Sequence, residues 1–256
     1  LFALTEGEMN QLMERMPIEE KVGQLIVVGF DGTKVNSTIR ANIRQRFVGG
    51  VTLFARNIES PRQVARLTNE LQKLARETEH QIPLFIATDQ EGGWIARLKK
   101  GATVLPGNMA LGATRSAELA EQAGKITAIE LAAVGINLNF APVMDVNNNP
   151  CNPVIDRRSF GESPELVSRL GGAYIGGLQQ NGVLATAKHF PGHGDTTVDS
   201  HTDLPTVKHN LERIQAIELK PFRAAIEAGV GAIMTAHIVY SALDTDRPAT
   251  LSRAIL

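Results

Sequence analysis

The chain has 256 residues, of which 43% are hydrophobic and 21% are charged, a composition that is ordinary for a globular protein. Its 26 Lys and Arg residues against 27 Asp and Glu residues give a net charge of -1, so the charge gives no reason to expect binding to nucleic acid or to an anionic membrane. Cys151 is the only cysteine, which excludes an intrachain disulfide, and no apolar run approaches the roughly 20 residues of a membrane span.

One unit recurs along the chain: a short apolar strand, a polar loop and an amphipathic helix. Each strand candidate is short, rich in Val, Ile, Leu, Phe or Ala, and only weakly alternating, as is typical of strands buried on both faces of a parallel sheet. In chain order we expect these strands at residues 22–30, 49–55, 83–89, 136–143, 182–190 and 231–239.

The helices between these strands have recognisable ends. Ser60-Pro61 and Ser163-Pro164 each read as an N-cap followed by the first helical turn. Glycines stand where a left-handed residue is expected to end a helix, at Gly135, Gly182 and Gly229. Pro221 is expected to divide residues 211–228 into two helices or one kinked helix.

Repeated alternation of strands and helices predicts an α/β fold with right-handed crossovers. An open doubly wound sheet and a closed (β/α)8 TIM-type barrel both fit. The barrel is favoured because polar motifs follow strand after strand. A closed barrel needs eight βα units and about six are present, so we expect an incomplete barrel, a single domain over residues 1–256 that is truncated at its C-terminus. A second fragment or a second copy could complete it.

Polar residues gather where the strands end. Asp89 and Glu91 follow the third strand, a loop dense in Asn, Pro and Arg occupies 141–161, and "KHFPGHGDTTVDSH" occupies 188–201. In an α/β barrel the active site lies at the C-terminal ends of the strands. These loops are therefore expected to meet around one site.

Three interpretations of the 189–201 stretch are open. His189 and His193 are four residues apart, but Pro191 and Gly192 prevent the helix that would place both on a zinc ion. His193 and Asp195 could instead serve a tight loop, bonding its backbone groups.

The third interpretation is acid–base catalysis by Asp199 and His201. Residues two apart in an extended segment point the same way, so the carboxylate and the imidazole can meet. The carboxylate would then orient the ring and raise its basicity.

Four motifs resemble glycoside hydrolase family 3, in its β-N-acetylglucosaminidase (NagZ-like) branch. They are "DQEGG" followed by Arg97, "NPVIDRRSFG", "KHFPGHGDTTVDSH" and "MTAHI", in the family's order. The resemblance covers essentially the whole chain. It implies a (β/α)8 barrel enzyme that hydrolyses terminal non-reducing β-linked N-acetylglucosamine with retention, from peptidoglycan fragments in cell-wall turnover or from chitooligosaccharides.

The resemblance also implies roles for individual residues. His201 would be the general acid/base and Asp199 its partner, where most glycosidases use a carboxylic acid. Substrate binding would fall to Asp89, Arg97, Arg158, Lys188 and His189. No cofactor and no metal are implied. The family's nucleophilic aspartate lies in a segment that has no counterpart within 1–256, so the isolated chain is expected to lack this group.

Other interpretations stay open. A β-N-acetylglucosaminide phosphorylase or a catalytically inert sugar-binding fragment would carry the same motifs. Glu91 is expected to be a structural carboxylate paired with a neighbouring Arg, Trp94 either flanks a sugar or packs, and Asp145 could simply cap its loop. For the compartment, the cytoplasm is favoured, with export open if a signal peptide has been removed.

Overall fold

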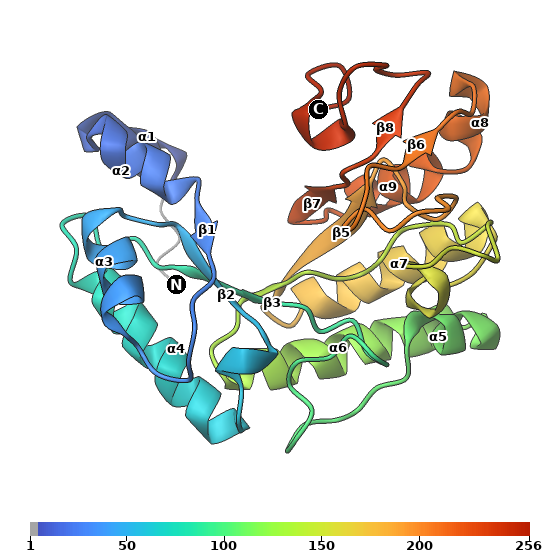
Figure 1. Ribbon diagram of the computed structural model, residues 1–256. Helices are drawn as coiled ribbons and strands as arrows, with labels where there is room; N and C mark the ends of the chain where they lie inside the picture. The colour runs from blue at the N-terminus through green and yellow to red at the C-terminus, as the bar shows by residue number, and fades with distance from the viewer. Residues whose placement is uncertain (1–4) are drawn as a thin grey trace. The chain divides into compact units, whose positions relative to one another are not determined.

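The computed structural model describes residues 5–256, which form two compact units of alternating helices and parallel strands (Figure 1). The first unit comprises the chain up to Thr88 together with Ala133–Asn137. The second comprises Asp89–Ala132 and Leu138–Leu256. No helix of the described residues is both long and apolar enough to cross a membrane.

The first unit holds three parallel strands in chain order, with Val27 paired to Gly50 and Gly50 to Phe85. Two of its helices, α3 and α4, pack against each other (Figure 1). Its elements are α1 (Glu6–Arg15), α2 (Ile18–Gln24), β1 (Val27–Val28), α3 (Ser37–Gln45), β2 (Gly50–Leu53), the 3-10 helix η1 (Ala55–Asn57), α4 (Pro61–Arg76) and β3 (Phe85–Thr88).

Helix α4 begins where the sequence predicts. Ser60 is its N-cap, accepting a hydrogen bond from the backbone N–H of Gln63, and Pro61 occupies the first turn. Its apolar stripe is buried over Val64, Leu67, Leu71 and Leu74.

The strand expected at 22–30 is wrong over most of its length. Helix α2 runs to Gln24, and β1 has two residues. Pro17 starts this helix and acidic residues fill its first turn, which favours a helix N-terminus. Gly23 lies against the chain after α3, where a Cβ would be 2.1 Å from the carbonyl oxygen of Arg46. This contact with a distant part of the chain therefore favours a helix where the apolar residues of 22–30 alone predict a strand.

The second unit holds β4, β5 and β7, again parallel and in chain order, with Leu138 paired to Leu184 and Thr186 to Ala232. The helices are α5 (Asn108–Thr114), α6 (Ala117–Ala133), α7 (Pro164–Gln179), α8 (Leu211–Ala216) and α9 (Leu219–Glu227), and the 3-10 helices are η2 (Asp156–Arg158) and η3 (Ala249–Leu251). The strands are β4 (Leu138–Asn139), β5 (Leu184–Phe190), β6 (Thr206–Val207), β7 (Ala232–Thr235) and β8 (Val239–Tyr240).

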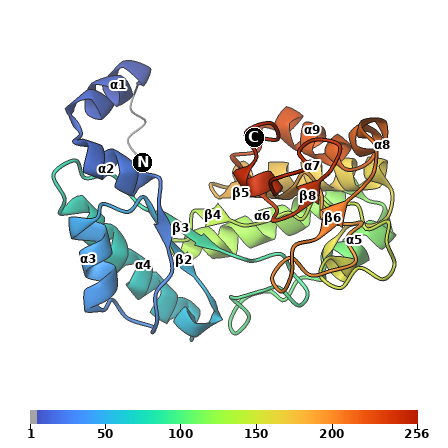
Figure 2. The same cartoon turned by 45° about the horizontal axis from the view of Figure 1, so that its top comes forward.

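Helices α6 and α7 run side by side (Figure 1), in contact through glycines. A Cβ on Gly124 would lie 2.4 Å from the carbonyl oxygen of Tyr174, and one on Gly177 would lie 2.1 Å from that of Glu121. The short parallel pair of β6 and β8, visible in Figure 2, was not expected from the sequence.

The predicted helix ends in this unit are confirmed, whereas β4 and β7 are shorter than the strands predicted at 136–143 and 231–239. Ser163 caps α7 by accepting from the backbone N–H of Leu166. Gly182 and Gly229 take left-handed φ angles of 84° and 72°, as does Gly135 in the first unit at 79°. Of the two possibilities for 211–228, two helices are found: they divide at residues 217–218, and Pro221 lies in the first turn of α9.

Candidate active site

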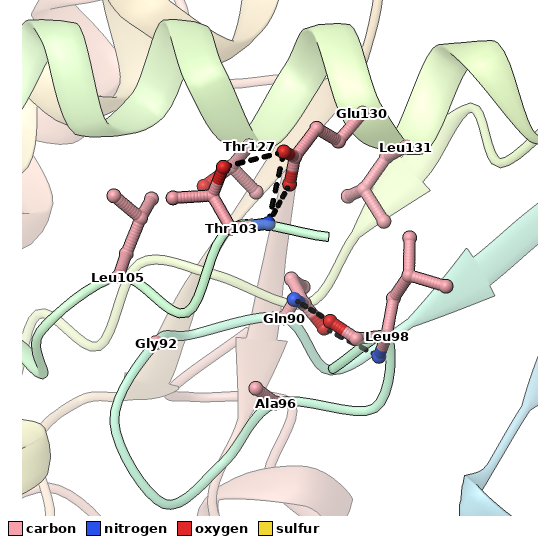
Figure 3. A pocket seen from close by; sticks show the side chains of 9 residues that line it. All are labelled: Gln90, Gly92, Ala96, Leu98, Thr103, Leu105, Thr127, Glu130 and Leu131. Carbon is pink, nitrogen blue, oxygen red and sulfur yellow. Dashed lines mark hydrogen bonds between the residues drawn. The ribbon is translucent and has the colours of Figure 1, made fainter. Parts of the chain in front are cut away.

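The loop after β3 begins with Asp89. The side chain of the next residue, Gln90, holds this loop in place by hydrogen bonding to its far end (Figure 3). The Gln90 Oε1 accepts from the backbone N–H groups of Arg97 and Leu98, at 2.8 and 3.0 Å, and its Nε2 donates to the carbonyl of Leu98. Gln90 is buried, so these bonds are shielded from water. They fix the short loop that carries both Glu91 and Arg97.

Acidic and basic side chains from the loop after β3, from η2 and from β5 meet in one place. Lys188 Nζ lies 3.0 Å from Asp89 Oδ1 and 2.6 Å from Glu91 Oε1. Arg158 forms a bidentate pair with Glu91, at 2.9 and 2.8 Å, and Arg97 Nη2 lies 3.6 Å from Asp89. We call this set the charged cluster; its members are Asp89, Glu91, Arg97, Arg158 and Lys188.

Glu91 is the most deeply buried carboxylate of the charged cluster, with 2% of its side chain exposed. Burial alone raises the pKa of Glu91, but the charge of Lys188 and the bonds and charge of Arg158 more than offset that effect and bring the pKa to about 2. Glu91 is therefore ionised and fully paired. This confirms the expected pairing with an Arg, and it leaves Asp89 as the more accessible carboxylate.

Asp145 receives three hydrogen bonds from the end of β5 and the loop that follows it. Its Oδ1 accepts from the backbone N–H groups of His189 and His193, at 3.2 and 2.6 Å, and its Oδ2 lies 2.7 Å from His189 Nδ1. Its side chain is completely buried. Burial raises the pKa of Asp145, but the charge and hydrogen bonding of the two histidines lower it overall. Asp145 thus holds the start of the 189–201 segment and does more than cap its own loop.

His189 joins Asp145 to the charged cluster. Its Nδ1 faces Asp145, and its Nε2 lies 3.3 Å from Arg158 Nη2. Because a guanidinium can only donate, Nε2 accepts and Nδ1 carries the proton. Burial lowers the pKa of His189, against the attraction of Asp145. The ring is thus a neutral bridge that orients Arg158.

His193 is buried, and both of its ring nitrogens have partners. Nδ1 lies 2.7 Å from Thr196 Oγ1, and Nε2 lies 2.8 Å from Ser200 Oγ. The rings of His189 and His193 are 5.9 Å apart, edge to face. Within residues 5–256, no group of three or more His, Cys, Asp or Glu side chains is arranged to hold a metal ion.

Asp199 and His201 form a local pair. The carboxylate Oδ1 lies 2.6 Å from His201 Nδ1 and also accepts the His201 backbone N–H at 2.9 Å. The hydrogen bond from the His201 backbone lowers the pKa of Asp199 most; burial opposes this, and the bond and charge of the His201 ring lower the pKa further. The imidazole is 76% exposed. A bond to Nδ1 leaves Nε2 free to exchange a proton with a ligand.

The predicted site residues thus lie in two groups. In the first group, Arg97 and Lys188 contact Asp89, and Arg158 contacts His189; Glu91 joins the two sets by pairing with both Lys188 and Arg158. Asp199 and His201 pair with each other and connect to the first group through neighbouring side chains, whose contributions were not foreseen: Asp145, Thr196, Ser200 and Asn152, which donates to the His193 carbonyl at 2.8 Å. In the sequence, the one sign of these contributions was the position of Asp145 in the polar loop after the fourth predicted strand.

Trp94 does not pack in the core. Its side chain is 72% exposed at the tip of the turn between Gly92 and Ile95. The guanidinium of Arg157 stacks on the indole, 4.3 Å from a ring centroid. The packing alternative for this residue is therefore wrong, and a contact with a ligand stays a prediction.

Three comparisons bear on identity. The family model described as "Glycosyl hydrolase family 3 N terminal domain" matches residues 17–256. Beta-hexosaminidase A of Pseudoalteromonas piscicida is 48% identical over 225 residues, which cover 82% of this chain and 38% of that protein. Beta-hexosaminidase of Nitrosomonas eutropha is 39% identical, covering 86% of this chain and 63% of that protein. The chain thus spans less than two thirds of these relatives.

Solved structures of similar proteins point to the same family. The family 3 beta-N-acetylglucosaminidase of Paenibacillus sp. has 52% identity and a TM-score of 0.93, covering 94% of this chain and 46% of that chain. NagZ of Neisseria gonorrhoeae, solved with N-trifluoroacetyl-D-glucosamine, has 36% identity and a TM-score of 0.84, covering 90% of this chain and 68% of that chain. The predicted fold, an α/β TIM-type barrel with about six of its eight units, is confirmed. The chain belongs to glycosyl hydrolase family 3 and carries its N-terminal domain.

Proposed function

We propose that the protein carrying this chain is an exo-acting, retaining β-N-acetylglucosaminidase. The observation that supports this most is the Asp199–His201 pair, with an Nδ1–Oδ1 distance of 2.6 Å and an open Nε2. The relatives support the substrate class, because those compared are beta-hexosaminidases and beta-N-acetylglucosaminidases. Peptidoglycan fragments and chitooligosaccharides are the glycans that we propose.

In the proposed first step, His201 Nε2 donates its proton to the glycosidic oxygen while the bond from that oxygen to the anomeric carbon breaks. A carboxylate forms the new bond to the anomeric carbon. In the second step water attacks the same carbon, His201 takes the proton from water, and the carboxylate leaves. Asp199 holds the Nδ1 proton throughout and stabilises the charged ring.

We propose that the attacking carboxylate does not come from residues 1–256. The carboxylates nearest to the site are each committed elsewhere: Glu91 to Lys188 and Arg158, Asp145 to the histidines, and Asp199 to His201. Asp89 is shared between Lys188 and Arg97 and suits sugar hydroxyls, which a carboxylate and its cationic neighbours bind together. We infer that the whole charged cluster with His189 receives the terminal sugar.

We further propose that the two units act as one barrel domain. The family model supports this, because its match runs through both units without interruption, from residue 17 to residue 256.

The acid role is tested with His201→Ala in the full protein. Turnover of a chitooligosaccharide, whose leaving group needs a proton, should fall about 100-fold or more, and the first step on a nitrophenyl glycoside should fall much less. Lys208→Ala, an exposed change just after β6, is the control. Equal losses on both substrates would contradict the acid role.

Two further measurements separate the alternatives. Adding phosphate and detecting N-acetylglucosamine 1-phosphate would identify a phosphorylase. Calorimetry on the 256-residue chain with N-acetylglucosamine tests the charged cluster separately: binding without turnover supports a sugar site that lacks its nucleophile, and turnover by this chain alone contradicts our assignment of the nucleophile.

A further inference from the structure

The orientation of the His193 ring follows from its hydrogen bonds. The Thr196 hydroxyl donates to the His193 carbonyl at 3.1 Å. A hydroxyl has one hydrogen, so at the 2.7 Å contact with His193 Nδ1 the Thr196 oxygen accepts and Nδ1 donates. In the neutral ring the other nitrogen, Nε2, then carries a lone pair. At 2.8 Å it accepts the hydroxyl hydrogen of Ser200.

His193 is itself firmly held. Its backbone N–H donates to the buried Asp145 at 2.6 Å, and its carbonyl accepts from the side chain of Asn152 at 2.8 Å. His193, Asn152 and Thr196 are all buried. Bonds of this kind, removed from water, are costly to break because each would leave an unsatisfied polar group.

The segment that carries the acid–base pair is held quite differently. Residues 197–204 are bonded mostly among themselves: Asp199 accepts from the backbone of His201, Thr202 and Asp203. Asp199 and His201 are substantially exposed. Among the hydrogen bonds of this segment in the described chain, the one from Ser200 to His193 reaches outside it.

We propose that Ser200 and His193 are positioning residues that set where the Asp199–His201 pair stands relative to the charged cluster. This rests on the proposed function, and we call the Ser200 Oγ to His193 Nε2 bond the Ser200 tether. Ser200 lies between the two members of the pair, and adjacent Cα atoms are about 3.8 Å apart. Holding Ser200 therefore restricts both neighbours at once.

The Ser200 tether also completes a continuous connection between the two groups of site residues. Arg158 contacts His189, His189 contacts Asp145, Asp145 holds His193, and His193 accepts from Ser200. The proton donor is thereby placed by the same buried carboxylate that orients the sugar-binding Arg158. An acid that is misplaced by about 1 Å can lose much of its rate advantage.

The test is Ser200→Ala in the full protein, which removes one donor from a half-buried site and leaves the bonds within 197–204 intact. Backbone amide hydrogen exchange at 199–203, measured without substrate, should accelerate about tenfold, the effect of losing one hydrogen bond. The kcat for a chitooligosaccharide should fall by about the same factor, with KM little changed and a smaller loss on a nitrophenyl glycoside.

Two companion variants separate positioning from general loosening. Ser200→Thr keeps the hydroxyl and should restore slow exchange and turnover. Thr197→Ala, an exposed change on the same segment, should leave both unchanged. Unchanged amide exchange in Ser200→Ala overturns the tether, whatever His201→Ala does. Accelerated exchange supports it even if the His201 test fails, so the two proposals can fail separately.

Discussion

Lys188 Nζ lies 2.6 Å from Glu91 Oε1, and each side chain is only 2% exposed. Two buried opposite charges at this distance stabilise each other, and Arg158 closes the other side of the carboxylate at 2.8 and 2.9 Å. Breaking such a set by removing one member leaves an uncompensated buried charge, which is far more costly than breaking a surface ion pair.

Glu91→Gln should therefore lower the free energy of unfolding by about 3–5 kcal/mol, since Arg158 loses its carboxylate partner and Lys188 keeps only Asp89. Urea denaturation measures the change. Glu227→Gln, on the exposed side of α9, is the control and should fall within about 0.5 kcal/mol of the parent. A loss no larger than that of the control would contradict the importance of the pair.

Acid should destabilise the fold in two stages. His189 and His193 have pKa values lowered by burial, so below about pH 6.5 the unfolded chain takes up protons that the native rings do not, and stability falls. The pKa of Glu91 is about 2 in the native state, against an ordinary value of 4.5. Its contribution is complete above about pH 4.5 and is lost as the pH falls towards 2, at up to about 1.4 kcal/mol per pH unit.

The measurement is the free energy of unfolding from pH 7 down to pH 3. Glu91→Gln should lose much of the second decline and keep the first. If Glu91→Gln instead lost the first decline and kept the second, this assignment of the groups would be contradicted.

Asp199→Asn should slow turnover about 10³- to 10⁴-fold with little change in KM. An amide can present its NH2 group to His201 Nδ1, which then accepts, so that Nε2 carries the proton permanently and cannot act as the base. Steady-state kinetics in the full protein measure the effect. Asp203→Asn, nearby on the same segment, is the control.

The glycine contacts between α6 and α7 give a matched pair of substitutions on one helix. Gly177→Ala should lower the free energy of unfolding by about 1–3 kcal/mol, because its Cβ would lie 2.1 Å from the carbonyl oxygen of Glu121. At Gly172 the nearest atom to a Cβ is 3.9 Å away. Gly172→Ala should instead stabilise by about 0.5–1 kcal/mol through helix propensity. Equal effects would contradict the close packing.

Element ends that depend on local chemistry were predictable. The N-caps at Ser60 and Ser163 need only a hydroxyl and a following helix, and the left-handed glycines at 135, 182 and 229 need only a missing Cβ. The stretch around Gly23 was misjudged, because its helix depends on contact with residues 46–47, more than twenty positions away. The pairing of β6 with β8 could not be predicted, because four residues are too few to show a strand pattern.

The site residues divide in the same way, into those that the local sequence predicts and those that depend on contacts between distant segments. Asp89, Arg97, Arg158, Lys188 and His189 are brought together because each lies at the end of a strand or in the loop that follows one. The contributions of Ser200, Thr196 and Asn152 depend on hydrogen bonds between loops, and residue type alone does not reveal these. Asp145 follows a strand as the others do, but its burial depends on the fold.

The openness of the His201 ring has a consequence for the timing of the proposed reaction. An imidazole that is 76% exposed is directly open to bulk water, so the proposed reaction needs no internal chain of side chains to carry protons to it. In the proposed reaction, a bound glycan would cover the ring and exclude water from it. The leaving portion of the substrate would thus shield the proton transfer from water. We expect the first step to be slower for glycans whose leaving portion is short.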